Sequence, residues 1–282
     1  MDAPINLKPE SLYLDLMKKV LAFTLWPEPP MPAAALSYPW MTLREKLAIA
    51  IARGLSRITK KYQVVINRAV DERYRKDGYI WPSYAHTMIG LKRLDNIQDC
   101  IEKVLKDGIE GDLIETGVWR GGASIFMRAV LAAYGVHDRK VFVADSFEGL
   151  PEPDIEKYPL DKGDRLHKVT YLAVSKEDVE ENFRKYGLLD AQVVFLKGWF
   201  KDTLPNAPIK KLSILRLDGD MYGSTMEALE SLYPKLSKGG YCLIDDYGLE
   251  GCRKAVDDFR AKNGINAEMR TADWTGRSWR KL

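Results

Sequence analysis

The 282-residue chain contains few cysteines, and none is placed as in a metal-binding motif. Cys100, Cys242 and Cys252 do not have the spacing of metal ligands, so we expect reduced thiols in a cytoplasmic protein. An excess of charge is also missing, because the formal net charge is only +3. A chain with so little excess charge gives no reason to expect nucleic acid as a partner.

Long apolar runs, internal repeats and low-complexity segments are missing as well. No apolar run approaches the roughly 18 residues that a membrane span needs. The N-terminus does not combine a basic start, an apolar core and a small-residue cleavage site, so we expect no secretion signal. Apolar residues make up 46% of the chain and charged residues 29%, which is an ordinary balance for a globular protein with a sizeable core.

From about Asp95 onward, short apolar segments alternate with segments of helical periodicity. The apolar segments are 111–117, 140–147, 192–198, 212–220 and 239–246. Strands that alternate with helices are typical of crossover units in a parallel sheet. We therefore predict a doubly wound, mainly parallel α/β fold, and we expect the last two short runs, 267–272 and 277–282, to form a hairpin at one edge.

Residues 1–78 differ from the rest of the chain. A helix is expected from Ser11 to Trp26, and a proline-rich break follows it. A second predicted helix repeats leucine or isoleucine at helical spacing, at Leu43, Leu47, Ile51, Leu55 and Ile58. We interpret it as an amphipathic helix packed on the main domain or on a second subunit. The alternatives are a mobile cover over an active site and a peripheral contact of residues 41–60 with an anionic surface.

The first strand of the repeating part ends in a glycine-rich turn, Glu115–Gly122. Glycines here allow a tight turn and let a ligand approach the main chain, although a tight connection alone would also need them. The pattern is neither G-x-G-x-x-G nor the phosphate loop that ends in Lys-Ser/Thr. Because Glu115 stands at the front of the turn, a polyanion is disfavoured and a cation or an amino group is favoured.

Asp145 ends the second predicted strand. In open parallel sheets, ligands bind beyond the carboxyl ends of the strands, and an acid after the second strand is where a ribose is held through its hydroxyls. A cap on a turn or helix is the alternative role for a single aspartate. Together with the glycine-rich turn, Asp145 indicates a nucleoside ligand without a pyrophosphate, and S-adenosylmethionine fits this description.

Asp218 and the pair Asp245–Asp246 end two further predicted strands, about one strand–helix–strand unit apart. Three carboxylates that converge without a counter-charge would repel one another and take up protons. A divalent cation removes this conflict, and Mg²⁺ prefers oxygen ligands. We therefore predict that the three carboxylates bind Mg²⁺, which would activate a substrate hydroxyl, and that Asp218 or Asp220 accepts its proton. Caps or surface salt bridges are the alternative roles.

At this point the residues resemble a known family, that of the macrocin O-methyltransferases (TylF-like). The resemblance runs from about Tyr79 to the C-terminus. It rests on the segments HTMIG, ETGVWRGGA, ADSFEGLP, GWFKDTLP, LRLDGDMY and IDDY, which occur in this order. It implies a Rossmann-like enzyme that uses S-adenosylmethionine and Mg²⁺ to methylate a sugar hydroxyl of a glycosylated natural product or a glycan precursor.

The resemblance also assigns residues and regions. The implied donor-binding residues are Thr87, Met88, Glu115, Thr116, Gly117, Val118, Trp119, Asp145, Ser146, Trp199 and Phe200. The implied metal ligands are Asp218, Asp245 and Asp246, with Asp218 or Asp220 as the base. The expected domains are an N-terminal helical region, 1–78, and a methyltransferase domain, 79–282, with a lid around 153–175. Residues from Pro27 to about Val70 look longer than the same region of the family.

Two alternatives to this function remain open. The same metal chemistry would serve a catechol-like diol as the acceptor, and a fold that keeps only the nucleoside pocket would be a non-catalytic scaffold. We expect at least a homodimer, from the resemblance and from the apolar stripes before Tyr79. Of the three histidines, His86 lies in a matching segment, whereas we interpret His137 and His167 as surface residues.

Overall fold

The structure is a computed structural model that describes residues 8–27, 29, 31–32, 41–58, 65–66 and 72–282. Its centre is a seven-stranded sheet with the order β5-β4-β3-β6-β7-β9-β8. The strands are β3 (Asp112–Thr116), β4 (Val141–Asp145), β5 (Val193–Lys197), β6 (Leu212–Leu217), β7 (Leu236–Ile244), β8 (Arg270–Thr271) and β9 (Arg277–Arg280). Strands β3 to β7 are parallel, whereas β9 is antiparallel to both β7 and β8. The predicted doubly wound sheet and its terminal hairpin are confirmed.

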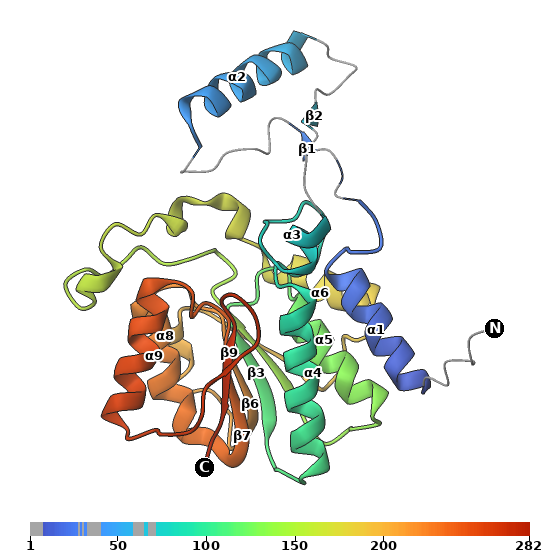
Figure 1. The fold of residues 1–282 in the computed structure, drawn as a ribbon, viewed down its shortest axis with the longest axis vertical. Helices are drawn as coiled ribbons and strands as arrows, with labels where there is room; N and C mark the ends of the chain where they lie inside the picture. The colour runs from blue at the N-terminus through green and yellow to red at the C-terminus, as the bar shows by residue number, and fades with distance from the viewer. Residues whose placement is uncertain (1–7, 28, 30, 33–40, 59–64, 67–71) are drawn as a thin grey trace.

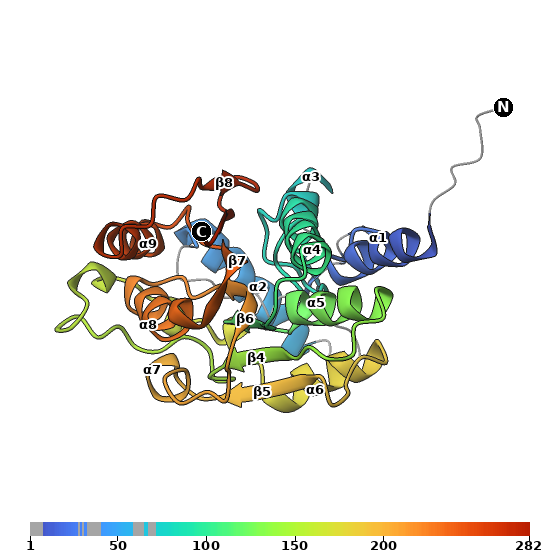
Figure 2. The same cartoon turned by 90° about the horizontal axis from the view of Figure 1, so that it is seen from below.

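Helices cover both faces of this sheet (Figures 1 and 2). One face carries α1 (Pro9–Leu21), α4 (Leu91–Lys106), α5 (Gly122–Ala133) and α6 (Lys176–Lys185), and the other carries α7 (Phe200–Thr203), α8 (Tyr222–Leu232) and α9 (Glu250–Lys262). Successive strand side chains point to opposite faces. Leu113 and Val143 therefore join one core cluster, while Ile114 and Phe142 join the other. Because both faces are covered, the strands read as continuous apolar runs.

The N-terminal region contributes to the first of these two cores. Leu14, Met17 and Leu21 of α1 are buried there, against α4 and α5. Four further described elements precede α4: helix α2 (Leu43–Ile58), the short antiparallel pair β1 (Met31–Pro32) and β2 (Val65–Ile66), and α3 (Glu72–Lys76). The predicted first helix thus ends at Leu21, earlier than expected. The boundary at residue 78 stays a prediction.

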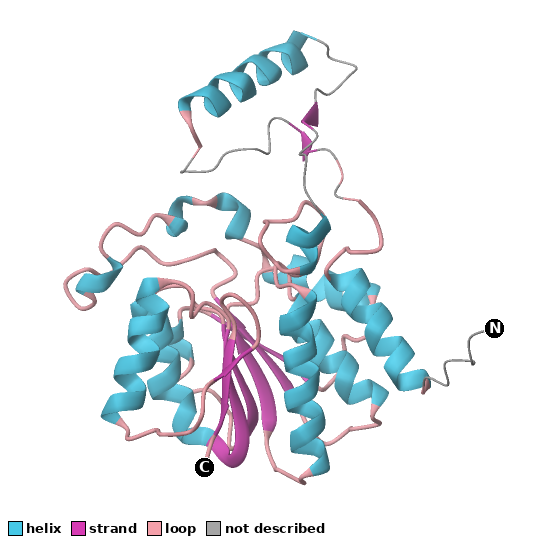
Figure 3. Ribbon diagram, viewed as in Figure 1, coloured by secondary structure: helices cyan, strands magenta, loops and turns pink. Residues whose placement is uncertain are grey.

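Helix α2 (Leu43–Ile58) is the second predicted amphipathic helix, and it stands apart from the sheet in Figure 3. Its stripe of five leucine and isoleucine side chains is exposed, by between 49% and 83%. The described part of the single chain therefore does not pack this stripe on the main domain. Contact with a second subunit, a cover over the site and contact with an anionic surface stay predictions. No described helix is long and apolar enough to cross a membrane.

The segment around 153–175, expected to be a lid, lies over the carboxyl ends of the strands and contains three short 3-10 turns, 159–161, 166–168 and 170–172. It is anchored to the first turn of α8. The Asp161 carboxylate accepts hydrogen bonds from the backbone N–H groups of Tyr222, at 2.7 Å, and Gly223, at 2.9 Å. The Tyr158 ring packs on Gly223, where a Cβ atom would come within 2.4 Å of it. Movement of the segment stays a prediction.

His86 gives the fold a pH dependence. Its Nδ1 lies 2.6 Å from the Tyr186 hydroxyl. Burial lowers the pKa of His86 to about 4, with help from the nearby charges of Lys185 and Arg120. The unfolded chain therefore binds the proton first as the pH falls, so stability is lost between pH 6.5, the ordinary value, and about 4.

We expect His86→Asn to flatten this part of the stability curve. In wild type, the free energy of unfolding should fall by roughly 1 kcal/mol more than in the variant across the window, after allowance for partial exposure. Urea denaturation of both proteins at a series of pH values measures the difference. Parallel curves would show that His86 does not stay neutral in the folded protein.

Candidate active site

The strand ends open into one cavity of about 520 Å³, a volume typical of small-molecule sites. The segment from Gly149 to Leu172 and the ends of β3 to β6 contribute to its lining. Nine of the predicted site residues line it: Met88, Gly117, Trp119, Asp145, Ser146, Trp199, Phe200, Asp218 and Asp220. The other predicted residues do not: Thr87, Glu115, Thr116, Val118, Asp245 and Asp246.

Gly117 brings the turn after β3 against the end of β6. Its φ is +81°, and a Cβ atom here would lie only 1.7 Å from the carbonyl oxygen of Asp218. The backbone N–H of Asp218 in turn donates to the Thr116 carbonyl, at 2.9 Å. Only glycine fits this contact, so the close approach of the two strand ends depends on it.

Asp145 ties together the two turns that border the cavity. Its carboxylate accepts hydrogen bonds from the backbone N–H groups of Val118 and Phe147, each at 2.7 Å. Burial raises the pKa of Asp145, and these N–H groups oppose the rise. The side chain thus acts as the turn cap named as its alternative role. Because it also lines the cavity, the ribose contact stays a prediction.

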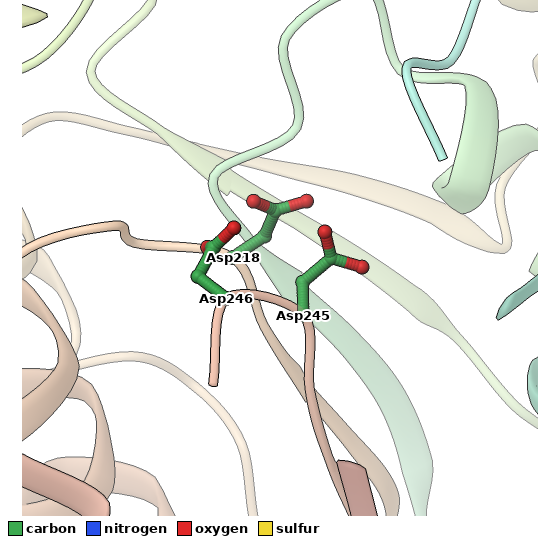
Figure 4. A group of neighbouring side chains, drawn as sticks. All are labelled: Asp218, Asp245 and Asp246. Atoms are coloured by element: carbon green, nitrogen blue, oxygen red, sulfur yellow. The ribbon is translucent and has the colours of Figure 1, made fainter. Parts of the chain in front are cut away.

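Asp218, Asp245 and Asp246 lie around one point (Figure 4). Each offers a carboxylate oxygen, and these oxygens are within 4.8 Å of one another. The register explains this, because Leu217 of β6 pairs with Ile244 of β7 and the acids follow directly. The backbone N–H of Asp220 donates to Asp246, at 3.2 Å. The structure therefore brings together the three predicted metal ligands.

The expectation that these acids lack a counter-charge is wrong. Arg216 of β6 is 2% exposed, and its Nη1 donates to Glu115, at 2.5 Å, and to Asp218, at 2.9 Å. Its Nη2 donates to one oxygen of Asp245, while Arg93 of α4 donates to the other. Arg216 stands two residues before Asp218, so strand alternation could have placed both on one side. Nothing in the sequence marked Arg93.

Two guanidinium groups do not balance the acids around them. Glu115, Asp218, Asp220, Asp245, Asp246 and Asp273 are six carboxylates in the described part of the chain that lie on or next to this network. Burial raises the pKa of Glu115 to about 7 and, with repulsion from Asp218, that of Asp220 to about 8.

The metal-ligand group itself is costly to ionise fully. Burial, with repulsion from neighbouring acids, raises the pKa values of Asp218 and Asp246, which favours a proton on these carboxyl groups. A divalent cation can replace such a proton, and all the donor atoms are oxygens, the ligands that Mg²⁺ prefers. Each Asp245 oxygen retains a lone pair beside its arginine. The residues therefore fit a magnesium ion.

His167 is a cavity residue that the sequence interpretation missed. It was expected to be a surface residue, yet it is half-buried and lines the cavity from the segment above the strand ends. Its Nδ1 is buried and has no hydrogen-bond partner among the described residues. Only its place in the expected lid could have indicated this role.

Solved structures define the class of protein to which this fold and site belong. The calicheamicin methyltransferase CalS11 matches with a TM-score of 0.56 at 18% identity, and the match covers 88% of this chain and 96% of the CalS11 chain. At this identity the match shows a similar fold and nothing more. The O-methyltransferase NovP matches with a TM-score of 0.81 at 46% identity and covers 97% of this chain and 99% of its own. The fold is that of a Rossmann-like methyltransferase.

The sequence comparisons identify the family. The family model described as macrocin-O-methyltransferase (TylF) matches residues 10–281. An 8-demethyl-8-(2,3-dimethoxy-alpha-L-rhamnosyl)-tetracenomycin-C 4'-O-methyltransferase from Streptomyces olivaceus is 49% identical over 270 residues, 95% of this chain and 92% of its own. The demethyldecarbamoylnovobiocin O-methyltransferase of Streptomyces niveus is 48% identical over 273 residues, 96% of this chain and 94% of its own. The chain belongs to the macrocin O-methyltransferase (TylF) family and is an O-methyltransferase.

These comparisons also bear on the N-terminal region. The family match begins at residue 10 and therefore spans the stretch from Pro27 to Val70. Since NovP covers 97% of this chain and this chain covers 99% of NovP, the two chains are close in length. NovP therefore gives no sign of a longer N-terminal region in this chain, and the comparison with the family as a whole stays a prediction.

Gly117→Ala tests the contact between the two strand ends. The new methyl group cannot fit beside the Asp218 carbonyl, so the turn must move. We expect the affinity for S-adenosylmethionine to fall at least tenfold and the free energy of unfolding to fall by more than about 1 kcal/mol. Calorimetric titration and urea denaturation measure the two effects.

Gly135→Ala is the matched control. Gly135 has a similar φ, +63°, but a Cβ atom there meets nothing within 4 Å. The Gly135→Ala variant should lose only about 1 kcal/mol of its free energy of unfolding and should bind the donor normally. If the two variants behaved alike, the contact with Asp218 would not matter for the site.

Proposed function

We propose that this enzyme transfers a methyl group from S-adenosylmethionine to a sugar hydroxyl of a glycosylated natural product, with Mg²⁺ held by Asp218, Asp245 and Asp246. The observation that carries the proposal is the convergence of these carboxylates at the edge of a cavity of small-molecule size. The sugar acceptor is supported by the tetracenomycin relative, whose name specifies a rhamnosyl compound. A catechol-like diol has no such support, and membership of an enzyme family disfavours a non-catalytic scaffold.

The donor would lie in the cavity beside β3, β4 and β5. Gly117 lets the main chain approach a ligand closely, and Asp145 fixes the turns on both sides of that place. Trp199 and Phe200, which line the cavity after β5, offer aromatic surface for an adenine ring. When bound, S-adenosylmethionine supplies a methyl group on a positively charged sulfur, and the acids at the strand ends favour such a cation.

The acceptor hydroxyl would lie between the donor and the acids after β6. When bound, Mg²⁺ would make a hydroxyl more acidic. Asp218 and Asp220 both line the cavity, so either can accept the proton. Asp218 already shares its carboxylate with Arg216, at 2.9 Å. Asp220 donates its backbone N–H to Asp246, at 3.2 Å, and burial with repulsion from Asp218 raises its pKa, which favours uptake of a proton.

Residues 153–175 would exclude water from the reacting groups. Their anchor on α8, through Asp161, joins them to the helix that begins directly after Asp220 and Met221. A closed cover over the site aligns the donor with the acceptor and prevents water from screening the charges. We also propose that the exposed stripe of α2 contacts a second subunit in at least a homodimer, because apolar side chains this exposed gain most from such burial.

Removal of the metal and of the acids separates their roles. We expect a chelator to abolish turnover and added Mg²⁺ to restore it. Asp218→Asn should lower kcat by about 10²-fold or more and weaken metal binding, because it removes a ligand. Asp220→Asn should lower kcat but leave metal binding intact if Asp220 is the base.

Turnover of a rhamnoside acceptor with radiolabelled donor, together with titration of the metal, measures these effects. The titration needs no acceptor, so it stays informative whichever sugar is the true substrate. Full activity in the presence of a chelator, or in the Asp218→Asn variant, would contradict the metal assignment.

His167 is expected to contact the acceptor. His167→Ala should raise the KM of the acceptor about tenfold or more through loss of a buried hydrogen bond, with the donor affinity unchanged. His137→Ala is the control, because His137 is exposed and does not line the cavity. Equal KM values for the two variants would show that His167 does not contact the acceptor.

A further inference from the structure

Arg93 reaches from α4 to the acids at the strand ends and is held firmly there. It is 7% exposed, and its Nη1 donates to Asp245. Its Nε donates to Asp273, at 2.9 Å. A Cβ atom on Gly276 would come within 2.9 Å of its side chain, so the turn between β8 and β9 packs directly on it. The guanidinium group therefore has little freedom to leave Asp245.

Asp245 is fixed by its main chain as well as by its carboxylate. Its carbonyl oxygen accepts a hydrogen bond from the Thr275 hydroxyl, at 3.0 Å. The backbone N–H of Thr275 donates to Asp273, the second partner of Arg93, also at 3.0 Å. Arg93 and the turn between β8 and β9 thus form one unit around Asp245, while Arg216 binds the other carboxylate oxygen of Asp245.

Both carboxylate oxygens of Asp245 already bind a guanidinium group, one from Arg93 and one from Arg216. A divalent cation that binds Asp245 must share it with both, and their positive charges repel the cation. In a buried site this repulsion is large, because charges a few ångströms apart are weakly screened there. The affinity of carboxylate sites for divalent cations is tuned by the charge of the surrounding groups.

We propose that Arg93 is a positioning residue and a built-in counter-ion for Asp245. It holds the carboxylate in place when no metal is bound and weakens the binding of the metal, so that the ion exchanges readily. This inference rests on the proposed metal site. Arg93 contributes this function through Asp245 and does not itself line the cavity.

The test uses Mn²⁺ alone, followed by electron paramagnetic resonance, without donor or acceptor. Arg93→Met removes the charge and retains much of the side-chain volume, so we expect Mn²⁺ to bind at least about tenfold more tightly than in wild type. Arg93→Lys retains the charge and should stay close to the wild-type affinity. In the presence of a chelator, the melting temperature of Arg93→Met should be lower than that of wild type. Mn²⁺ should raise the melting temperature of the variant by more than it raises that of wild type.

Arg128→Met is the matched control. Arg128 is also buried and ion-paired, with Asp190 at 2.5 Å, but it belongs to α5 and does not contact the acids of the site. It should lose stability without any change in the affinity for Mn²⁺. A general loosening of the fold would instead change both variants in the same way.

Asp273→Asn gives an independent test that retains Arg93. Without the charge of Asp273, Arg93 is left with Asp245 as its charged partner among the described contacts, so Mn²⁺ should bind several-fold more weakly than in wild type. Opposite shifts in the two variants are the signature of charge. If Arg93→Met does not fold, Asp273→Asn alone decides, because an unchanged or tighter Mn²⁺ affinity contradicts the proposal.

The outcomes separate this inference from the metal site itself. If wild type does not bind Mn²⁺, or binds it equally well after Asp218→Asn, the proposed metal site is wrong. If wild type binds Mn²⁺ through Asp218 but Arg93→Met binds it equally or more weakly, the metal site stands and the role of Arg93 is refuted.

Discussion

The site depends on the buried guanidinium group of Arg216. It contacts Glu115 of β3, just before the glycine-rich turn, Asp218 at the end of its own strand and Asp245 at the end of the next strand. Burial of one charge is costly unless it is paired, so this single cation makes it feasible to end three neighbouring strands in acids. The region expected to bind the donor and the region expected to bind the metal are therefore joined through one side chain.

The same network explains why the acids are not neutralised. Arg216 and Arg93 pair with Glu115, Asp218, Asp245 and Asp273. Asp220 and Asp246 have no arginine partner among the described contacts, and burial with repulsion from the neighbouring acids raises their pKa values. A carboxyl group whose proton a cation can replace is therefore retained beside the cavity. The two arginines supply enough positive charge for the fold. The carboxylates that they leave unpaired are available to bind a metal and to accept a proton.

Much of this arrangement could be predicted from the sequence, because strand ends are set by short-range pattern. The parallel strands, their acids and the closeness of Asp218 to Asp245–Asp246 follow from the alternation of strands and helices. The counter-charge from Arg216 could have been found from strand alternation, but that from Arg93 could not, because Arg93 is 152 residues from Asp245 along the chain. His167 was missed for a related reason, because its burial depends on how an irregular segment folds over the strand ends. The sequence of such a segment has no helical or strand periodicity from which burial could be predicted.

The most direct test of the central claim is anomalous diffraction from a crystal of this protein soaked in Mn²⁺. The account predicts an anomalous peak at the point where the carboxylates of Asp218, Asp245 and Asp246 meet, with both guanidinium groups still in contact with Asp245. A soaked crystal with no peak there, and with the three carboxylates bound only to protein groups, would contradict it.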